Sequence, residues 1–319
     1  MSIKIKKTSK IFLVQKLILI FFLFISCGFY SDKKIETIIK SKKYILYENF
    51  PSKFVETRNV EVFLPSGYDT LESCPVLYMF DGQNIFHGKK SWMSNEYSHG
   101  WQVDETIDSL NKLGEIPPLI VVGAFNIGEK RASEYMPAKP KNEVEKRIAS
   151  ADKRIRESYQ KWGISSDRFL KFLVKELKPH IDTNFKTNRG RNSTFLAGAS
   201  MGGLVSAYAI SEYPNIFGGA ACMSTDWPEL NGVFLEYLKN NLPSPKNHKI
   251  YFDFGTKGLD SLYEPYQLII DTLMIKHGYE ENKNWITMKF NGDDHNENFW
   301  RKRFHYPLKF FFNKEELIK

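Results

Sequence analysis

The sequence contains little cysteine, with three residues in 319. So few cysteines exclude a small fold held together by a framework of disulfide bonds. The chain also shows no internal repeat and no low-complexity segment, which argues against a repeat protein. No group of cysteines and histidines has the spacing of metal ligands, so we expect neither a metal ion nor a cofactor.

The net charge is small over most of the chain, although the formal net charge of the whole chain is +8. Residues 1–26 carry five lysines and no acidic residue, so the remainder carries only +3. That remainder has no basic stripe interleaved with aromatic residues that could stack on bases. We therefore expect no nucleic-acid partner.

The apolar run near the N-terminus is too short to cross a bilayer. It reads "LILIFFLFIS", whereas a membrane-spanning helix needs about 20 apolar residues. After a lysine-rich start, a run of this length predicts a signal peptide over residues 1–26. The stretch "FISCG" resembles a bacterial lipobox, which makes Cys27 the lipidated first residue of the mature protein. Ordinary cleavage or an uncleaved anchor is the alternative.

A lipidated Cys27 would make a membrane one partner of the protein, because each buried acyl methylene contributes roughly 0.8 kcal/mol to binding. We expect a lipid-anchored protein of the bacterial cell envelope, on the periplasmic or outer-membrane face. Residues 27–42 are polar and predict a tether to the folded domain.

Residues 43–319 alternate between apolar strand-like runs and amphipathic helical segments. This alternation follows two strands with an antiparallel pattern, and it predicts an α/β fold. We expect one three-layer domain with a mostly parallel sheet and antiparallel N-terminal strands. Cys74 and Cys222 fall near opposite ends of parallel strands, so we predict two unpaired thiols.

One charged segment interrupts the alternation at residues 139–161. Its apolar residues recur at helical spacing, which predicts a single amphipathic helix between two sheet elements. Such a helix is either a solvated surface element or a lid over a site.

The stretch "GASMG" places Ser200 between a buried strand and a helix. This is the position of a nucleophile elbow, whose sharp turn exposes the serine hydroxyl. The backbone N–H of Met201 would then lie at a helix N-terminus, where it can stabilise an oxyanion. A glycine-rich helix entry with a spectator serine is the alternative.

A nucleophilic serine needs a base and an acid that orients the base. In this architecture the acid and then the histidine follow the serine along the chain. His295 lies in the polar loop directly after the last strand and is the predicted base. His305 lies in the final helix, where we predict a packing role for it. Asp260, in the loop after the strand "KIYFDFG", is the predicted acid. The other acid candidates are Glu264, Asp253, Asp293 and Asp294.

The loop "DGQN" after the strand "PVLYMF" is the expected source of a second oxyanion donor. The N–H of Gln83 is the predicted donor, and Gly82 would let the backbone approach the substrate. A simple Asp-Gly turn is the alternative.

With these residues placed, the chain resembles the esterase branch of the α/β-hydrolases over roughly residues 55–313. That branch includes esterase D, enterochelin-type esterases, feruloyl and acetylxylan esterases, and mycolyltransferases. The similar motifs are "LYMFDGQNIF", "GASMGG", "FDFGTKGLD" and "HNENFW". The segment "RASEYMP" resembles a family segment near the substrate, which implies binding roles for Arg131, Glu134 and Tyr135.

The resemblance and the residues predict a serine carboxylic-ester hydrolase that works through an acyl-enzyme. The expected substrate is a siderophore-type ester or a carbohydrate or feruloyl ester. The alternatives are an acyltransferase with the same triad and a non-catalytic binding protein on a hydrolase scaffold. Trp92, Trp101, Trp227 and Trp300 could stack on substrate or belong to the core, and Trp227 ranks first for binding.

Overall fold

The computed structural model describes residues 37–41, 43–91 and 99–312. These residues belong to one compact unit of the chain. The predicted signal peptide, the lipidation site Cys27 and the tryptophan Trp92 lie outside the described residues.

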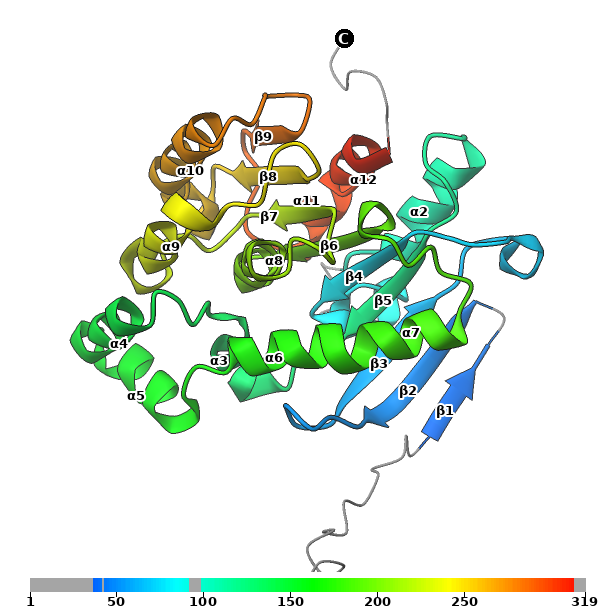
Figure 1. Cartoon of the computed structure of the whole chain (residues 1–319), viewed down its shortest axis with the longest axis horizontal. Coiled ribbons are helices and arrows are strands. Elements are labelled where there is room, and N and C mark those ends of the chain that lie inside the picture. The colour runs from blue at the N-terminus through cyan, green and yellow to red at the C-terminus, as the bar shows by residue number, and fades with distance from the viewer. Residues whose placement is uncertain (1–36, 42, 92–98, 313–319) are drawn as a thin grey trace, which may run out of the picture. The chain divides into compact units, whose positions relative to one another are not determined.

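A nine-stranded sheet forms the centre of the described part of the chain (Figure 1). The strand order is β1-β2-β3-β5-β4-β6-β7-β8-β9. The first three strands and β5 pair antiparallel, and the strands from β5 to β9 pair parallel. The strands are β1 (Thr37–Lys40), β2 (Tyr44–Phe50), β3 (Arg58–Phe63), β4 (Val76–Phe80), β5 (Ile120–Ala124), β6 (Thr194–Ala199), β7 (Gly219–Met223), β8 (Lys249–Gly255) and β9 (Trp285–Phe290).

Helices cover both faces of the sheet, so the central strands are buried on both sides. In β4, Val76, Tyr78 and Phe80 belong to one apolar cluster, while Leu77 and Met79 belong to the other. This is the near-continuous apolar pattern of a parallel strand between two helical layers. The predicted three-layer α/β architecture is confirmed.

Figure 1 shows α6 and α7 crossing one face of the sheet. Their apolar cluster also takes side chains from α8, α9 and α10, and the cluster on the other face takes side chains from α2, α11 and α12. The α-helices are α2 (Val103–Lys112), α3 (Arg131–Tyr135), α4 (Lys141–Ser150), α5 (Lys153–Trp162), α6 (Ser166–Phe172), α7 (Lys178–Asn184), α8 (Met201–Glu212), α9 (Val233–Asn241), α10 (Glu264–Lys276), α11 (Glu297–Arg303) and α12 (His305–Phe312). None of the helices in the described ranges is long and apolar enough to span a bilayer.

The charged segment 139–161 forms two helices, α4 and α5, so the prediction of a single helix was wrong. The chain becomes extended at Ala151. Asp152 then caps α5, because its carboxylate accepts a hydrogen bond of 3.1 Å from the Ile155 N–H. An aspartate in this position starts a new helix by satisfying one of the free N–H groups of the first turn.

One other boundary also differs from the sequence-based expectation. Residues 37–40, predicted as part of the tether, form β1 on the edge of the sheet. Pro179 lies in the first turn of α7, directly after a π-helical turn at Leu173–Leu177, and α7 continues to Asn184. The wider turn accommodates a residue that lacks an N–H and would clash with the preceding turn of an α-helix.

Both cysteines of the described domain are buried free thiols, as predicted. Cys222 lies in β7, and burial raises the pKa of its thiol. Cys74 lies just before β4 and contacts Thr187 across an isolated bridge.

Candidate active site

Ser200 occupies a sharp turn between β6 and α8. Its backbone has φ 58° and ψ −126°, a left-handed conformation that is strained for a residue with a side chain. The Ser200 N–H is shared between the carbonyl oxygens of Met223 at 3.0 Å and Ser224 at 3.1 Å. The neighbouring strand β7 therefore holds the turn in place.

Two glycines around Ser200 are required by close packing. A Cβ on Gly198 would lie 2.5 Å from the Gly202 carbonyl oxygen, and one on Gly203 would lie 2.6 Å from Thr225 Oγ1. Both distances are too short for any side chain. A Cβ on Gly202 would find its nearest neighbour, Asp81 Oδ2, at an ordinary 3.5 Å.

Backbone N–H groups are available beside the serine. The N–H of Met201 is the first of α8, and within the described ranges no group accepts a hydrogen bond from it. The same is true of the Gln83 N–H in the short helical turn η2 (Gly82–Asn84) that follows β4. The first turn of α8 packs against this loop through Gly202 and Asp81.

Position 82 requires a glycine because its backbone packs closely against the sheet. A Cβ there would lie 2.6 Å from the carbonyl carbon of Gly123 in β5. This contact explains the glycine without a substrate, and the predicted role of Gly82 in substrate approach stays a prediction.

The loop that contains Gln83 is held by the side chain of Asp81. Arg131 donates two hydrogen bonds to this carboxylate, at 2.7 Å from Nε and 2.8 Å from Nη2. Asn126 donates a third at 2.6 Å, and the Asp81 N–H donates to the Tyr135 hydroxyl at 3.1 Å. Burial lowers the pKa of Arg131, but the charge and hydrogen bonds of Asp81 outweigh it and raise the pKa. Arg131 therefore fixes the loop that follows β4.

The predicted base and acid are brought into contact. His295 lies in the loop after β9, and its Nδ1 is 2.5 Å from Oδ1 of Asp260 in the turn η8 (Gly258–Leu262) after β8. Asp260 is fully buried. Burial alone would raise the pKa of Asp260, but hydrogen bonds from His295, Ser224 and the Gly255 N–H outweigh it and lower the pKa. An ionised Asp260 accepts the Nδ1 proton, which leaves Nε2 of His295 as an acceptor.

The other acid candidates are engaged elsewhere. Glu264 pairs with Lys289 at the surface, and Asp253 and Asp293 both pair with Arg303. The Asp294 side chain accepts a hydrogen bond from the backbone N–H of His295 at 2.7 Å and so orders the loop.

Tyr263 lies beside the histidine. Its ring meets the His295 imidazole edge-on with 5.6 Å between centroids. Burial and the carboxylate of Asp226 raise the pKa of Tyr263. Tyr263 was not predicted from the sequence, although its place three residues after Asp260 was a usable signal.

Asp226 also lies in this neighbourhood and was missed. Its N–H donates to the Ser200 carbonyl oxygen at 3.2 Å, and its Oδ1 accepts from the Tyr263 hydroxyl at 3.5 Å. Burial, together with the carboxylate of Glu229, raises the pKa of Asp226 to about 6. The signal for Asp226 was its place after β7, because loops at the carboxyl ends of parallel strands line ligand sites.

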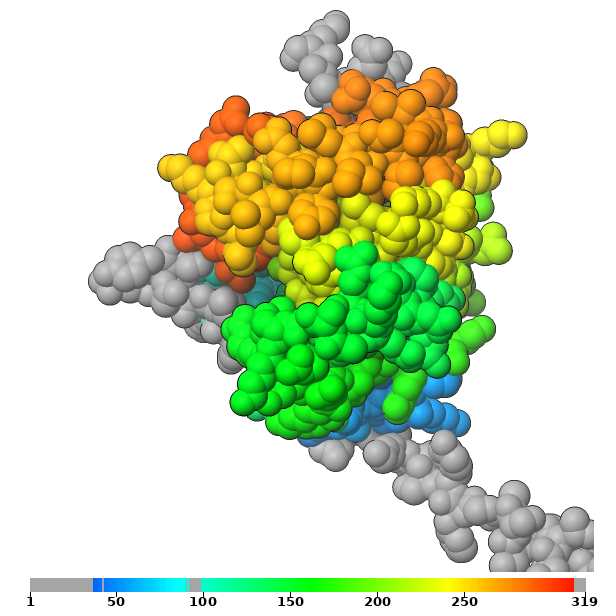
Figure 2. Space-filling model, turned by 90° about the vertical axis from the view of Figure 1, so that its left-hand side faces the viewer, coloured from blue at the N-terminus to red at the C-terminus, as the bar shows by residue number. Residues whose placement is uncertain are grey.

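The helices α4 and α5 are tied to the loop that follows Asp226. The Tyr159 hydroxyl donates to Glu229 at 2.7 Å, and Arg147 donates to the Asn231 carbonyl oxygen at 3.1 Å. Figure 2 shows α4 and α5 in green beside the yellow segment that contains η7 (Glu229–Gly232) and α9. A lid role for this segment stays a prediction.

Trp227 belongs to the core, which corrects the predicted binding role. It is 1% exposed, and its Nε1 donates to Gln267 at 2.8 Å. A ring enclosed by Phe234 and Phe252 has no face left for a substrate.

Glu134 is also structural, because it forms a fully buried bidentate ion pair with Arg58 at 2.6 and 2.8 Å. The side chain of Trp300 does lie beside the site, with its ring centroid 5.0 Å from that of His295. Trp101 packs against Trp300, with 5.3 Å between the ring centroids.

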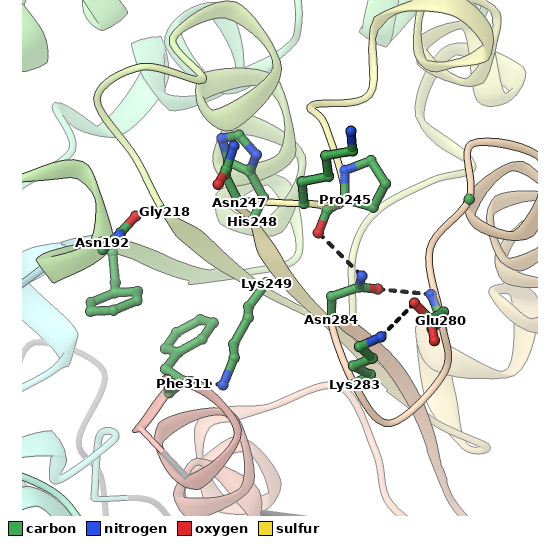
Figure 3. A pocket seen from close by; sticks show the side chains of 13 residues that line it. Asn192, Gly218, Pro245, Asn247, His248, Lys249, Glu280, Lys283, Asn284 and Phe311 are labelled. Carbon is green, nitrogen blue, oxygen red and sulfur yellow. Dashed lines mark hydrogen bonds and ion pairs between the residues drawn. The ribbon is translucent and has the colours of Figure 1, made fainter. Parts of the chain in front are cut away.

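A cavity of about 690 Å³ lies at the other end of the strands (Figure 3). Its lining includes residues at the amino ends of β6, β7 and β8, whereas Ser200 and Asp260 follow carboxyl ends. Its polar groups pair with one another, since Lys283 donates to Glu280 at 2.7 Å and Asn284 donates to the Pro245 carbonyl oxygen at 3.1 Å (Figure 3). Within the described ranges, no cluster of three histidine, cysteine or acidic side chains could hold a metal ion.

Comparisons with known proteins agree with this architecture. The model of the family described as "Putative esterase" matches residues 52–305. An endo-1,4-beta-xylanase/feruloyl esterase from Xylanibacter ruminicola is 28% identical over 204 residues, which cover 61% of this chain and 22% of that protein.

Solved structures of esterases share the fold. A ferulic acid esterase has a TM-score of 0.61 at 17% identity, with 85% of this chain and 98% of that chain covered. The enterobactin esterase FES from Shigella flexneri has a TM-score of 0.59 at 20% identity, with 84% of this chain and 58% of that chain covered.

The three-layer sheet with its strand–serine–helix turn is an α/β-hydrolase fold. Because the family model covers most of the chain, the protein belongs to this esterase family. It is a carboxylic ester hydrolase, as predicted.

Proposed function

We propose that the protein hydrolyses carboxylic esters through a triad of Ser200, His295 and Asp260. The observation that supports this most strongly is the 2.5 Å contact between Asp260 Oδ1 and His295 Nδ1 beside the strained serine turn. Three loops at carboxyl ends of parallel strands supply the three side chains. A buried carboxylate that fixes the tautomer of a histidine is the arrangement that serine nucleophiles use.

In this mechanism, Nε2 of His295 takes the proton of Ser200 as its oxygen attacks the ester carbonyl carbon. The N–H groups of Met201 and Gln83 stabilise the negative charge on the carbonyl oxygen. The ester C–O bond then breaks, and His295 gives its proton to the departing alcohol. Water, deprotonated by His295, attacks the acyl-enzyme and releases the acid and the free serine.

The proposed substrates are feruloyl or other carbohydrate-linked esters and siderophore-type esters. The names of similar proteins support both groups, since two of them are feruloyl or ferulic acid esterases and one is an enterobactin esterase. Methyl ferulate and a trilactone siderophore, assayed side by side, distinguish the two groups. Hydrolysis of neither would contradict both assignments.

The catalytic assignment is tested with p-nitrophenyl acetate and butyrate. The wild type should turn over both esters, and Ser200→Ala should lose nearly all activity while its thermal unfolding stays close to that of the wild type. Equal activity of the two proteins would contradict the role of Ser200.

We also propose that Cys27 is lipidated and anchors the protein in the bacterial cell envelope. The support is the lysine-rich start, the short apolar run and the "FISCG" stretch of the sequence. Cys27→Ala should release the protein from membranes in a fractionation experiment. Continued membrane association of the variant would contradict lipidation.

A further inference from the structure

The second oxygen of the acid is held by a network that the triad alone does not explain. Oδ2 of Asp260 accepts hydrogen bonds from the Gly255 N–H at 2.6 Å and the Ser224 hydroxyl at 2.5 Å. Arg303 Nη2 lies 3.5 Å from the same oxygen. Ser224 and Arg303 are both buried.

The direction of the hydrogen bond from Ser224 is fixed by its other partners. Trp300 Nε1 donates to the Ser224 hydroxyl oxygen at 2.9 Å, and Arg303 Nη2 donates to it at 2.5 Å. A hydroxyl group has one hydrogen and two lone pairs. With both lone pairs occupied by donors that cannot accept, its only hydrogen points to Asp260. Oδ2 of Asp260 must therefore accept, which favours the ionised carboxylate.

Ser224 also connects the acid to the nucleophile through its backbone. Its carbonyl oxygen accepts the Ser200 N–H, and its own N–H donates to Asp253 through the backbone oxygen at 2.8 Å and Oδ1 at 3.1 Å. The residue has φ 37°, a left-handed conformation that is uncommon for serine. One residue at the end of β7 thus contacts both the serine turn and the carboxylate of Asp260.

Arg303 supplies the positive charge of this buried region. Besides Asp260, it faces Asp253 at 3.1 Å and Asp293 at 3.1 Å, and its side chain is 1% exposed. Burial raises the pKa of Asp253, whereas the pKa of Asp260 is lowered by its hydrogen bonds. The network therefore keeps negative charge on the carboxylate that faces His295.

We propose that Ser224 and Arg303 are positioning residues that hold Asp260 ionised and direct its Oδ1 to His295. This inference rests on the proposed triad. Neither side chain contacts the reacting atoms, so each side chain acts through the acid.

The decisive experiment is a double-mutant cycle with p-nitrophenyl butyrate. Ser224→Ala removes the hydroxyl and leaves the backbone contacts of the residue in place. We expect kcat to fall by about 10- to 100-fold with little change in KM, less than the ~10⁴-fold loss known for the acid itself in serine enzymes. In the Asp260→Asn background, the same change should have no further effect, because residues that act as a unit are not additive. An equal loss in both backgrounds would overturn the inference.

The pH profile of kcat/KM supplies a second readout that a merely structural role would not move. Loss of the Ser224 donor leaves more negative charge density on Asp260, which stabilises the His295 imidazolium. The acid limb of the profile should therefore shift to higher pH in Ser224→Ala, and also in Arg303→Lys, which loses the planar fork. An unchanged limb in both variants would overturn the inference.

A matched control is Arg301→Met on the same helix, since Arg301 donates to the carbonyl oxygens of His99 and Gly100 away from the acid. This variant should keep the pH profile of the wild type. If Ser200→Ala is as active as the wild type, the proposed function itself fails. If Ser200→Ala is inactive and Ser224→Ala is fully active, only the positioning role fails.

Discussion

Replacing Asp260 with asparagine tests which carboxylate orients the base. The carboxylate accepts Nδ1–H of His295 at 2.5 Å from a fully buried position, so water cannot take its place. Asparagine keeps the shape of the side chain but can present an N–H to Nδ1, which favours the wrong tautomer of the imidazole. In Ser-His-Asp enzymes this change lowers kcat by about 10⁴-fold. That factor corresponds to about 5.4 kcal/mol of transition-state stabilisation.

The assay is the steady-state hydrolysis of p-nitrophenyl butyrate at several pH values. Asp294→Asn is the matched control, because Asp294 accepts from the backbone N–H of His295 and does not contact the imidazole. We expect this control to lose far less activity than Asp260→Asn. If Asp260→Asn keeps kcat within tenfold of the wild type while Asp294→Asn abolishes activity, the assignment of the acid is refuted.

Three further predictions concern stability. Gly198→Ala should lower the free energy of unfolding by about 1–3 kcal/mol, because the new Cβ would lie 2.5 Å from a backbone oxygen. Gly202→Ala should be tolerated, and urea unfolding of the two variants tests the difference. Arg58→Met leaves its carboxylate partner buried without a counter-charge and should cost about 3–5 kcal/mol, seen as a lower Tm. Asp226 has its pKa raised from 3.8 to about 6, so the native state binds a proton that the unfolded chain has released, and stability falls as pH rises from about 4 to 6. Asp226→Asn should therefore be more stable by up to about 3 kcal/mol above pH 6 and show no gain below pH 4; a pH-independent difference would contradict this reasoning.

Much of the fold was predictable because buried parallel strands are continuous apolar runs. The strand before Ser200 and the strand before Asp260 were both recognised in this way, and their carboxyl ends then located the candidate triad. The break inside residues 139–161 was missed because apolar spacing continues across it. Only the capping role of Asp152 divides the segment.

The network around the acid could not be predicted, because its members come together only in the folded protein. Ser224 and Arg303 are separated by 79 residues and meet through the packing of α11 against the end of β7. Trp227 was placed wrongly for a related reason. A tryptophan in a loop after a strand can face either substrate or core, and only the position of Gln267 on another helix decides between them.

The order of the chain also determines when the site can exist during synthesis. Ser200 is made first, Asp260 follows, and His295 with the helix that carries Trp300 and Arg303 comes near the end. A chain emerging from the ribosome therefore holds the proposed nucleophile long before it holds the proposed base. Asp260 has its full set of partners only when His295 and Arg303, from this late part of the chain, have packed beside it. The proposed triad is therefore incomplete in any nascent chain that has not yet reached residues 295–303.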